Sequence, residues 1–163
     1  GTLGEEEGML LAELDARVVE HAWAQAVASL ERGRERAHGI LSSTGDRRLG
    51  VSREPACRRL GVALDARADA IVEGLWAEHE LAGAGEVGAQ EAVGLLLRID
   101  RRENACALLL ASRTGVINAA LEQQAAQNTG GQRQAERACD AVWGCVAATV
   151  RDARAQFPQA SHR

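Results

Sequence analysis

Residues 86–127 decide the fold of this chain, and they read EVGAQEAVGLLLRIDRRENACALLLASRTGVINAALEQQAAQ. Apolar side chains recur in this stretch every three or four residues, which is the spacing of one face of an α-helix. A run of turn-forming residues, Asn128-Thr129-Gly130-Gly131, follows it. The stretch therefore predicts one long amphipathic helix. Its expected stripe is Ala92, Leu96, Ile99, Glu103, Cys106, Leu110, Arg113, Ile117, Ala120 with Leu121, and Gln124.

The composition of the whole chain is that of a helical protein. Its 163 residues include 32 alanines and one phenylalanine, with no lysine and no tyrosine. Ala, Leu, Arg, Glu and Gln are strong helix formers, whereas strands favour β-branched and aromatic side chains. We therefore expect an all-α fold.

The same periodicity predicts three further helices, over about 5–41, 52–82 and 132–157. Clusters of turn residues or glycines separate the four segments, and a proline follows the last one. Four amphipathic segments with short connections are typical of an antiparallel up-down-up-down four-helix bundle. We expect such a bundle, with long helices, to form a single domain over residues 1–163.

Glycine inside a helix costs about 0.5–1 kcal/mol relative to alanine, and we expect Gly33 and Gly115 to mark bends. The last helix is expected to bury the stripe Ala135, Cys139, Val142, Val146, Val150, Ala153 and Phe157.

The charge and hydropathy of the chain argue against nucleic acids and membranes as its partners. The net charge of −4 argues against nucleic-acid binding, which usually requires a strongly basic face. No run approaches 18 apolar residues, so we expect no membrane insertion of this segment. The acidic amino-terminal stretch does not resemble a signal peptide.

The sequence contains no motif that points to a cofactor. The four cysteines lack CxxC spacing and no histidine cluster accompanies them, so no metal site is expected. Unpaired cysteines favour a reducing compartment such as the cytoplasm. Phosphate-binding loops, nucleophile elbows and covalent haem motifs are also missing, and without lysine the chain cannot form a Schiff base. The sequence thus disfavours an enzyme and predicts no cofactor.

Two charged residues, Glu103 and Arg113, occupy apolar-stripe positions of the expected helix over 86–127. They are ten residues apart, or about 15 Å along a helix, so they cannot pair with each other. A buried charge needs a partner. We expect an acidic residue of a neighbouring helix to hold Arg113, and contact with a small ligand is the alternative for both residues.

The tryptophans and an arginine cluster are the other candidate binding residues. Trp23, Trp76 and Trp143 each lie at the edge of a stripe, where they either cover the core or contact a partner. The arginines either complement the end of the first helix or, with two residues of the following loop, hold an anion. These arginines are Arg32, Arg34 and Arg36 in the helix and Arg47 and Arg48 in the loop.

Three functional classes fit these features. The first is a non-enzymatic interaction module that acts through helix–helix contacts with a protein partner or with copies of itself: an adaptor, a chaperone-like bundle or an assembly subunit. The second is the ligand-sensing four-helix domain of a bacterial receptor that binds a small anion. The third is an enzyme that uses Glu103 and Arg113, and it has the least support in the sequence.

Overall fold

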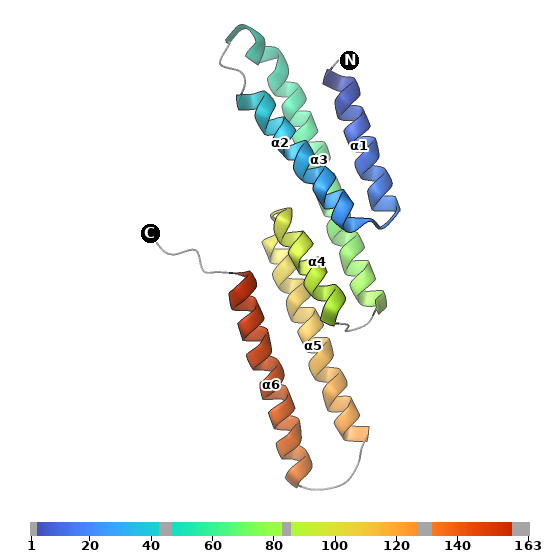
Figure 1. Cartoon of the computed structure of the whole chain (residues 1–163), viewed down its shortest axis with the longest axis vertical. Helices are drawn as coiled ribbons and strands as arrows, with labels where there is room; N and C mark the ends of the chain where they lie inside the picture. The colour runs from blue at the N-terminus through green and yellow to red at the C-terminus, as the bar shows by residue number, and fades with distance from the viewer. Residues whose placement is uncertain (1–2, 43–46, 83–85, 127–131, 158–163) are drawn as a thin grey trace, which may run out of the picture. The chain divides into compact units, whose positions relative to one another are not determined.

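The computed structural model describes residues 3–42, 47–82, 86–126 and 132–157. These residues form helices, with no strand among them, so the all-α prediction is confirmed (Figure 1). Within these ranges the chain forms six helices instead of the four expected. They are α1 Leu3–Val19, α2 Trp23–Ser42, α3 Arg47–Ala82, α4 Glu86–Arg98, α5 Arg102–Ala126 and α6 Gln132–Gln156.

The expected helix over 5–41 is interrupted between α1 and α2. His21 adopts a left-handed backbone conformation with φ of 56°. Its N–H donates to the carbonyl of Val18 at 3.1 Å, and the N–H of Ala22 donates to the carbonyl of Arg17 at 2.9 Å. This pair of hydrogen bonds is a Schellman motif, which ends a helix by satisfying its last carbonyls. The prediction of one continuous helix was therefore wrong here.

The expected helix over 86–127 is also interrupted at a left-handed residue. Asp100, between α4 and α5, has φ of 62°. An L-residue in this region costs roughly 1–2 kcal/mol, but aspartate tolerates it better than most residues. α2 and α5 run through Gly33 and Gly115, and the bends expected at these two positions stay predictions.

The second expected helix begins earlier than residue 52. α3 starts at Arg47 and contains Pro55 in its interior. Arg47 and Arg48 therefore belong to a helix and not to a loop, which corrects the prediction, and their side chains lie outside the described residues.

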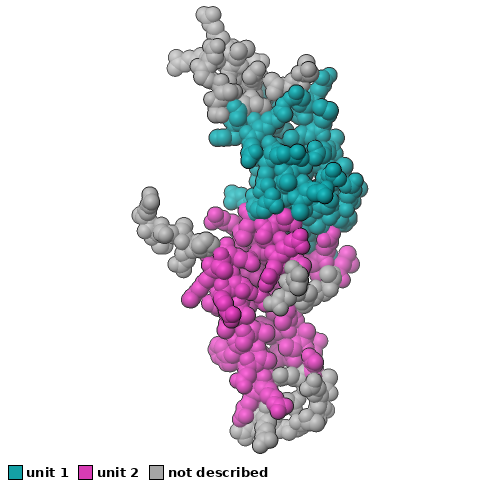
Figure 2. Space-filling model, in the orientation of Figure 1, with its two compact units in different colours: residues 1–77, 98–101 teal, residues 78–97, 102–163 magenta. Residues whose placement is uncertain are grey.

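The chain divides into two compact units (Figure 2). Unit 1 consists of Gly1–Ala77 with Arg98–Arg101, and unit 2 consists of Glu78–Leu97 with Arg102–Arg163. The single domain expected over residues 1–163 stays a prediction.

In unit 1, α1 packs on α2, and α2 meets α3 at two glycines. A Cβ on Gly33 would lie 2.8 Å from a methyl group of Leu64, and a Cβ on Gly74 would overlap the ring of Trp23. Without side chains at these positions the two helices can approach closely. The core of the unit comprises Leu14, Ala26, Val27, Leu30, Leu60, Leu64, Ala68, Ile71 and Leu75.

In unit 2, α5 and α6 pack against each other. The buried side chains of α4 and α5 are Ala89, Ala92, Val93, Leu95, Leu96, Ala105, Leu108, Leu109, Ser112 and Arg113. Residues 102–123 of α5 are long enough and, with a mean hydropathy of 1.2, apolar enough to cross a membrane. The other described helices do not meet these two criteria. Core helices of soluble proteins meet the same criteria, so this stretch does not establish membrane insertion.

Candidate interaction surface

Arg113 lies at the packed face between α5 and α6. Its side chain is 7% exposed, and its guanidinium forms an ion pair and a hydrogen bond with the carboxylate of Asp152 on α6. Asp152 is more accessible, with 30% of its side chain exposed. Asp152 is thus an acidic partner from a neighbouring helix, as expected for Arg113, and the pair links the two helices.

Glu103 does not share this environment. It is exposed in the first turn of α5, where a carboxylate complements the partial positive charge of the helix amino terminus. The sequence placed it in the core because the stripe was extended through residues 99–101. The left-handed Asp100 interrupts that phase, so the core position predicted for Glu103 was wrong. The structure does not bring Glu103 and Arg113 together.

The three tryptophans have different environments. Trp23 is buried in unit 1, where its ring packs against Gly74 and meets the His21 ring edge-on at 5.1 Å. Trp76 is partly buried in α3, whereas Trp143 on α6 is 70% exposed. Of the three candidates, only Trp143 presents most of its surface to a partner.

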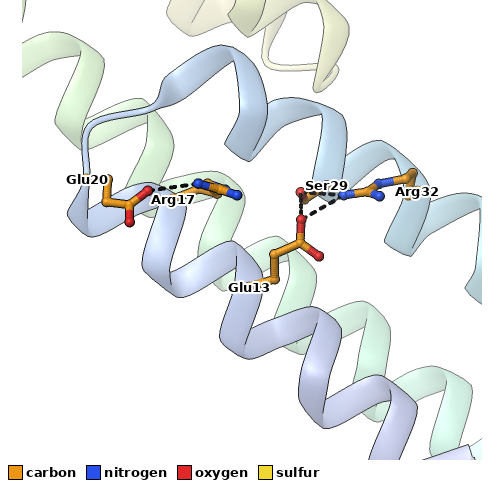
Figure 3. A network of polar contacts seen from close by, with 5 residues as sticks. All are labelled: Glu13, Arg17, Glu20, Ser29 and Arg32. Carbon is orange, nitrogen blue, oxygen red and sulfur yellow. Dashed lines mark hydrogen bonds and ion pairs between the residues drawn. The ribbon is translucent and has the colours of Figure 1, made fainter.

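Arg32 takes part in a polar network between α1 and α2 (Figure 3). The carboxylate of Glu13 accepts hydrogen bonds from Arg32 at 2.9 Å and from the hydroxyl of Ser29 at 3.2 Å. Arg32 also donates to the Ser29 oxygen at 2.9 Å. Nearby, Arg17 pairs with Glu20 within three residues of the chain (Figure 3). This network ties the two helices together through a serine that is 1% exposed.

The other two arginines of the α2 cluster also contact carboxylates. Arg36 pairs with Glu6 of α1. Arg34 donates to Asp65 of α3 at 3.0 Å and to the carbonyl of Ile99 at 2.9 Å. Since an anion would have to compete with these carboxylates, their arrangement argues against an anion site at Arg32, Arg34 and Arg36.

Residues 98–101 carry a second set of arginine contacts within unit 1. Arg98 donates two hydrogen bonds to the carboxylate of Glu31, at 3.0 and 2.5 Å. This hydrogen bonding raises the pKa of the Arg98 guanidinium, an effect that desolvation opposes and the charge of Glu31 reinforces. Arg101 donates to Asp69 at 2.7 Å. These contacts fix the segment that contains the left-handed Asp100.

The Arg34–Asp65 and Arg113–Asp152 pairs share some features of sequence position. Arg34 follows the left-handed His21 at the same spacing as Arg113 follows the left-handed Asp100. Each arginine lies on the helix that begins after the left-handed residue, and each pairs with an aspartate of the next helix. Buried residues recur at the same spacing, Ala26, Ser29 and Leu30 in α2 matching Ala105, Leu108 and Leu109 in α5.

One helix of unit 2 carries two apolar stripes. The face of α6 that is at least partly buried consists mainly of small residues: Ala138, Ala141, Val142, Cys145, Ala148, Thr149, Asp152, Ala153, Gln156 and Phe157. A second stripe is exposed and contains Cys139, Trp143, Val146 and Val150. We call these four residues the α6 outer stripe. The sequence had placed Cys139, Val146 and Val150 in the core, which was wrong.

α5 also exposes apolar side chains, namely Cys106, Leu110 and Leu121. Cys106, Leu110 and Leu121 were all expected in the core, and this prediction was wrong. Nine large apolar side chains are exposed in the described part of the chain, and five of them lie on α5 or α6. Exposed apolar surface is thus concentrated on the α5–α6 hairpin.

Helix geometry places these residues on one side of the hairpin. At 3.6 residues per turn, the α6 outer stripe occupies an arc of about 60° on that helix. Consider each helix viewed from its own amino end. In both α5 and α6, the exposed apolar residues lie clockwise from the face that packs against the other helix. Because the two helices run antiparallel (Figure 1), the two clockwise flanks face the same side. The hairpin therefore has one apolar side formed by both helices.

Comparisons of the chain with protein families, with curated proteins and with solved structures each gave no match. Among the residues that the structure describes, no three His, Cys, Asp or Glu side chains gather where they could hold a metal ion. The candidate site is thus the apolar side of the α5–α6 hairpin, argued from its geometry alone.

Proposed function

We propose that this chain is a non-enzymatic interaction module that binds a protein partner through the apolar side of α5 and α6. The observation that carries the proposal is the α6 outer stripe, which includes a tryptophan that is 70% exposed. Contiguous apolar patches on soluble proteins commonly mark interaction sites, and tryptophan is enriched among the residues that dominate binding energy.

The spacing of the stripe supports a helical partner. Its residues follow one another at intervals of four, three and four, which is the a/d repeat by which helices pack as knobs into holes. A partner that supplies two helices would complete an up-down-up-down four-helix bundle with α5 and α6. The bundle expected from the sequence is therefore proposed for the assembled form of the hairpin.

A ligand-sensing receptor domain is the competing proposal from the sequence. It would need arginines available to an anion, and Arg32, Arg34 and Arg36 each contact a carboxylate. Arg47 and Arg48 lie outside the described side chains. The contacts of the described arginines therefore favour the interaction module.

Site-specific photo-crosslinking in living cells tests the proposed function. A benzophenone amino acid replaces Trp143 in the full chain, and the same amino acid replaces Ala155 as the control. Ala155 is exposed on the opposite flank of α6. We expect light-dependent adducts with a polypeptide from position 143 and none from position 155. Equal labelling from the two positions, or none from either, would refute the proposal.

A further inference from the structure

The α6 outer stripe is symmetric along the helix. Its spacing of four, three and four residues reads the same in both directions, with a midpoint between Gly144 and Cys145. An antiparallel copy of the same helix therefore places Trp143 opposite Val146 and Cys139 opposite Val150. Each apolar residue of the stripe then meets an apolar residue of the copy. An isologous interface about a two-fold axis requires this self-complementarity.

The charges beside the stripe are arranged in the same way. Asp140 and Glu136 lie in the first half of α6, and Arg151 and Arg154 lie in its second half, with all four side chains exposed. An antiparallel copy centred on the same midpoint brings Asp140 near Arg151 of the second copy, and Glu136 near Arg154. A parallel copy would instead place like charges together, which opposes association.

The size of the surface fits a dimer. α5 and α6 have 25 residues each, so each helix is about 37 Å long. A side that is two helices wide, or about 20 Å, offers roughly 700 Å², close to the ~800 Å² that each partner contributes to a standard interface. The hairpin alone is thus large enough for a stable contact.

We propose that the partner is a second copy of this chain, docked through the α6 outer stripe with the two α6 helices antiparallel. The two-fold axis passes near Gly144 and Cys145. Leu110 and Leu121 of α5 extend the contact on each side. This inference rests on the proposed function and specifies the partner.

Sedimentation equilibrium of the full chain gives the first test. We expect a mass of twice 17.3 kDa at micromolar concentration. Val146→Glu should raise the dissociation constant by about 30-fold or more, the change typical of a hot-spot residue. Val62→Glu is the matched control, since Val62 is 68% exposed on α3 and outside the stripe. A monomeric wild-type chain, or equal effects of the two substitutions, would overturn the inference.

Disulfide trapping tests the orientation. Val150→Cys, made together with Cys106→Ser and Cys145→Ser, places a thiol opposite Cys139 of the second copy. Diamide accepts the two electrons and two protons of disulfide formation, and we expect a covalent dimer that disappears when Cys139→Ser is added. With Val150 retained, the two copies of Cys139 lie about 16 Å apart along the axis, too far for a bridge. Crosslinking through Cys139 alone would therefore refute the antiparallel arrangement.

The photo-crosslinking experiment separates this inference from the proposed function. An adduct of twice the chain mass supports both the interaction module and the second copy as its partner. Adducts only with a different polypeptide, from a chain that sediments as a monomer, would keep the interaction module and overturn the second copy as its partner. A monomer whose stripe binds anionic lipid vesicles, and gives no polypeptide adduct, would overturn both.

Discussion

We expect loss of Asp152 to destabilise the fold more than loss of its partner Arg113. Asp152→Ala removes the α6 acceptor of a guanidinium that is 7% exposed. Breaking a buried ion pair typically costs about 3–5 kcal/mol, because one charge stays in a medium that solvates it poorly. We expect Asp152→Ala to lower the free energy of unfolding by an amount in this range.

Substitution of Arg113 should cost less. It leaves the carboxylate of Asp152, which is 30% exposed and can be partly solvated. We expect about 1–3 kcal/mol for Arg113→Ala, the usual cost of an unsatisfied polar group. Arg113→Leu should lose less than Arg113→Ala because leucine restores apolar contact. The double variant Arg113→Leu with Asp152→Leu should be close to wild type or more stable, since it removes both charges.

Urea unfolding followed by far-ultraviolet circular dichroism measures these differences, at one protein concentration because association also stabilises the folded state. The more exposed Arg34–Asp65 pair of unit 1 provides the control. Arg34 and Asp65 are 33% and 61% exposed, so Asp65→Ala should cost less than about 1 kcal/mol. Equal losses for Asp152→Ala and Asp65→Ala would show that burial of the α5–α6 pair does not set its energy. Wild-type stability of both Arg113 variants, with loss of a bound anion, would assign Arg113 to a ligand site.

Three further substitutions test the packing and the helix ends. Gly74→Ala should lower the free energy of unfolding by about 1–3 kcal/mol, because its Cβ would overlap the Trp23 ring. Gly61→Ala in the same helix has open space around the new Cβ and should raise the free energy of unfolding by about 0.5–1 kcal/mol. Thermal melts that rank the two variants the other way would contradict the contact between Gly74 and Trp23. Asp100→Val should cost about 1–2 kcal/mol in urea unfolding, since a β-branched residue is strained at φ of 62°, and Asp100→Asn should be nearly neutral. Ser29→Ala should cost about 0.5–1.5 kcal/mol by the same assay, because it removes a buried hydroxyl that donates to Glu13.

Periodicity predicted the helices well but not their interruptions. The breaks at His21 and Asp100 use left-handed residues that are not glycine, and neither carries a strong local signal. The free-energy penalty at one such residue is small compared with the packing energy that a chain reversal permits. At His21 the contacts between α1 and α2 therefore decide that the helix ends there. After the break at Asp100, the buried face of α5 is formed by Ala105, Leu108, Leu109 and Ser112. Glu103 lies outside that face, whereas Arg113 is buried where α6 supplies its partner Asp152.

The choice between the two stripes of α6 also required the structure. Sequence analysis assigned Cys139, Val146 and Val150 to the core because they follow the helical spacing of one face. α6 instead turns mostly small residues, such as Ala141, Cys145 and Ala148, toward the interior of unit 2. Small side chains let two helices approach closely, and the larger residues are then left on the outer side.

The sequence by itself determined that this chain is helical, that helices end close to Ser42 and Ala126, and that Arg113 would need an acidic partner. Those conclusions follow from local propensity, spacing and the cost of burying a lone charge. Only the tertiary structure decided which face of each helix is buried, that Asp152 is the partner, and that Trp143 is exposed. A helix with two apolar faces can bury either one, and the packing of its neighbours makes that choice.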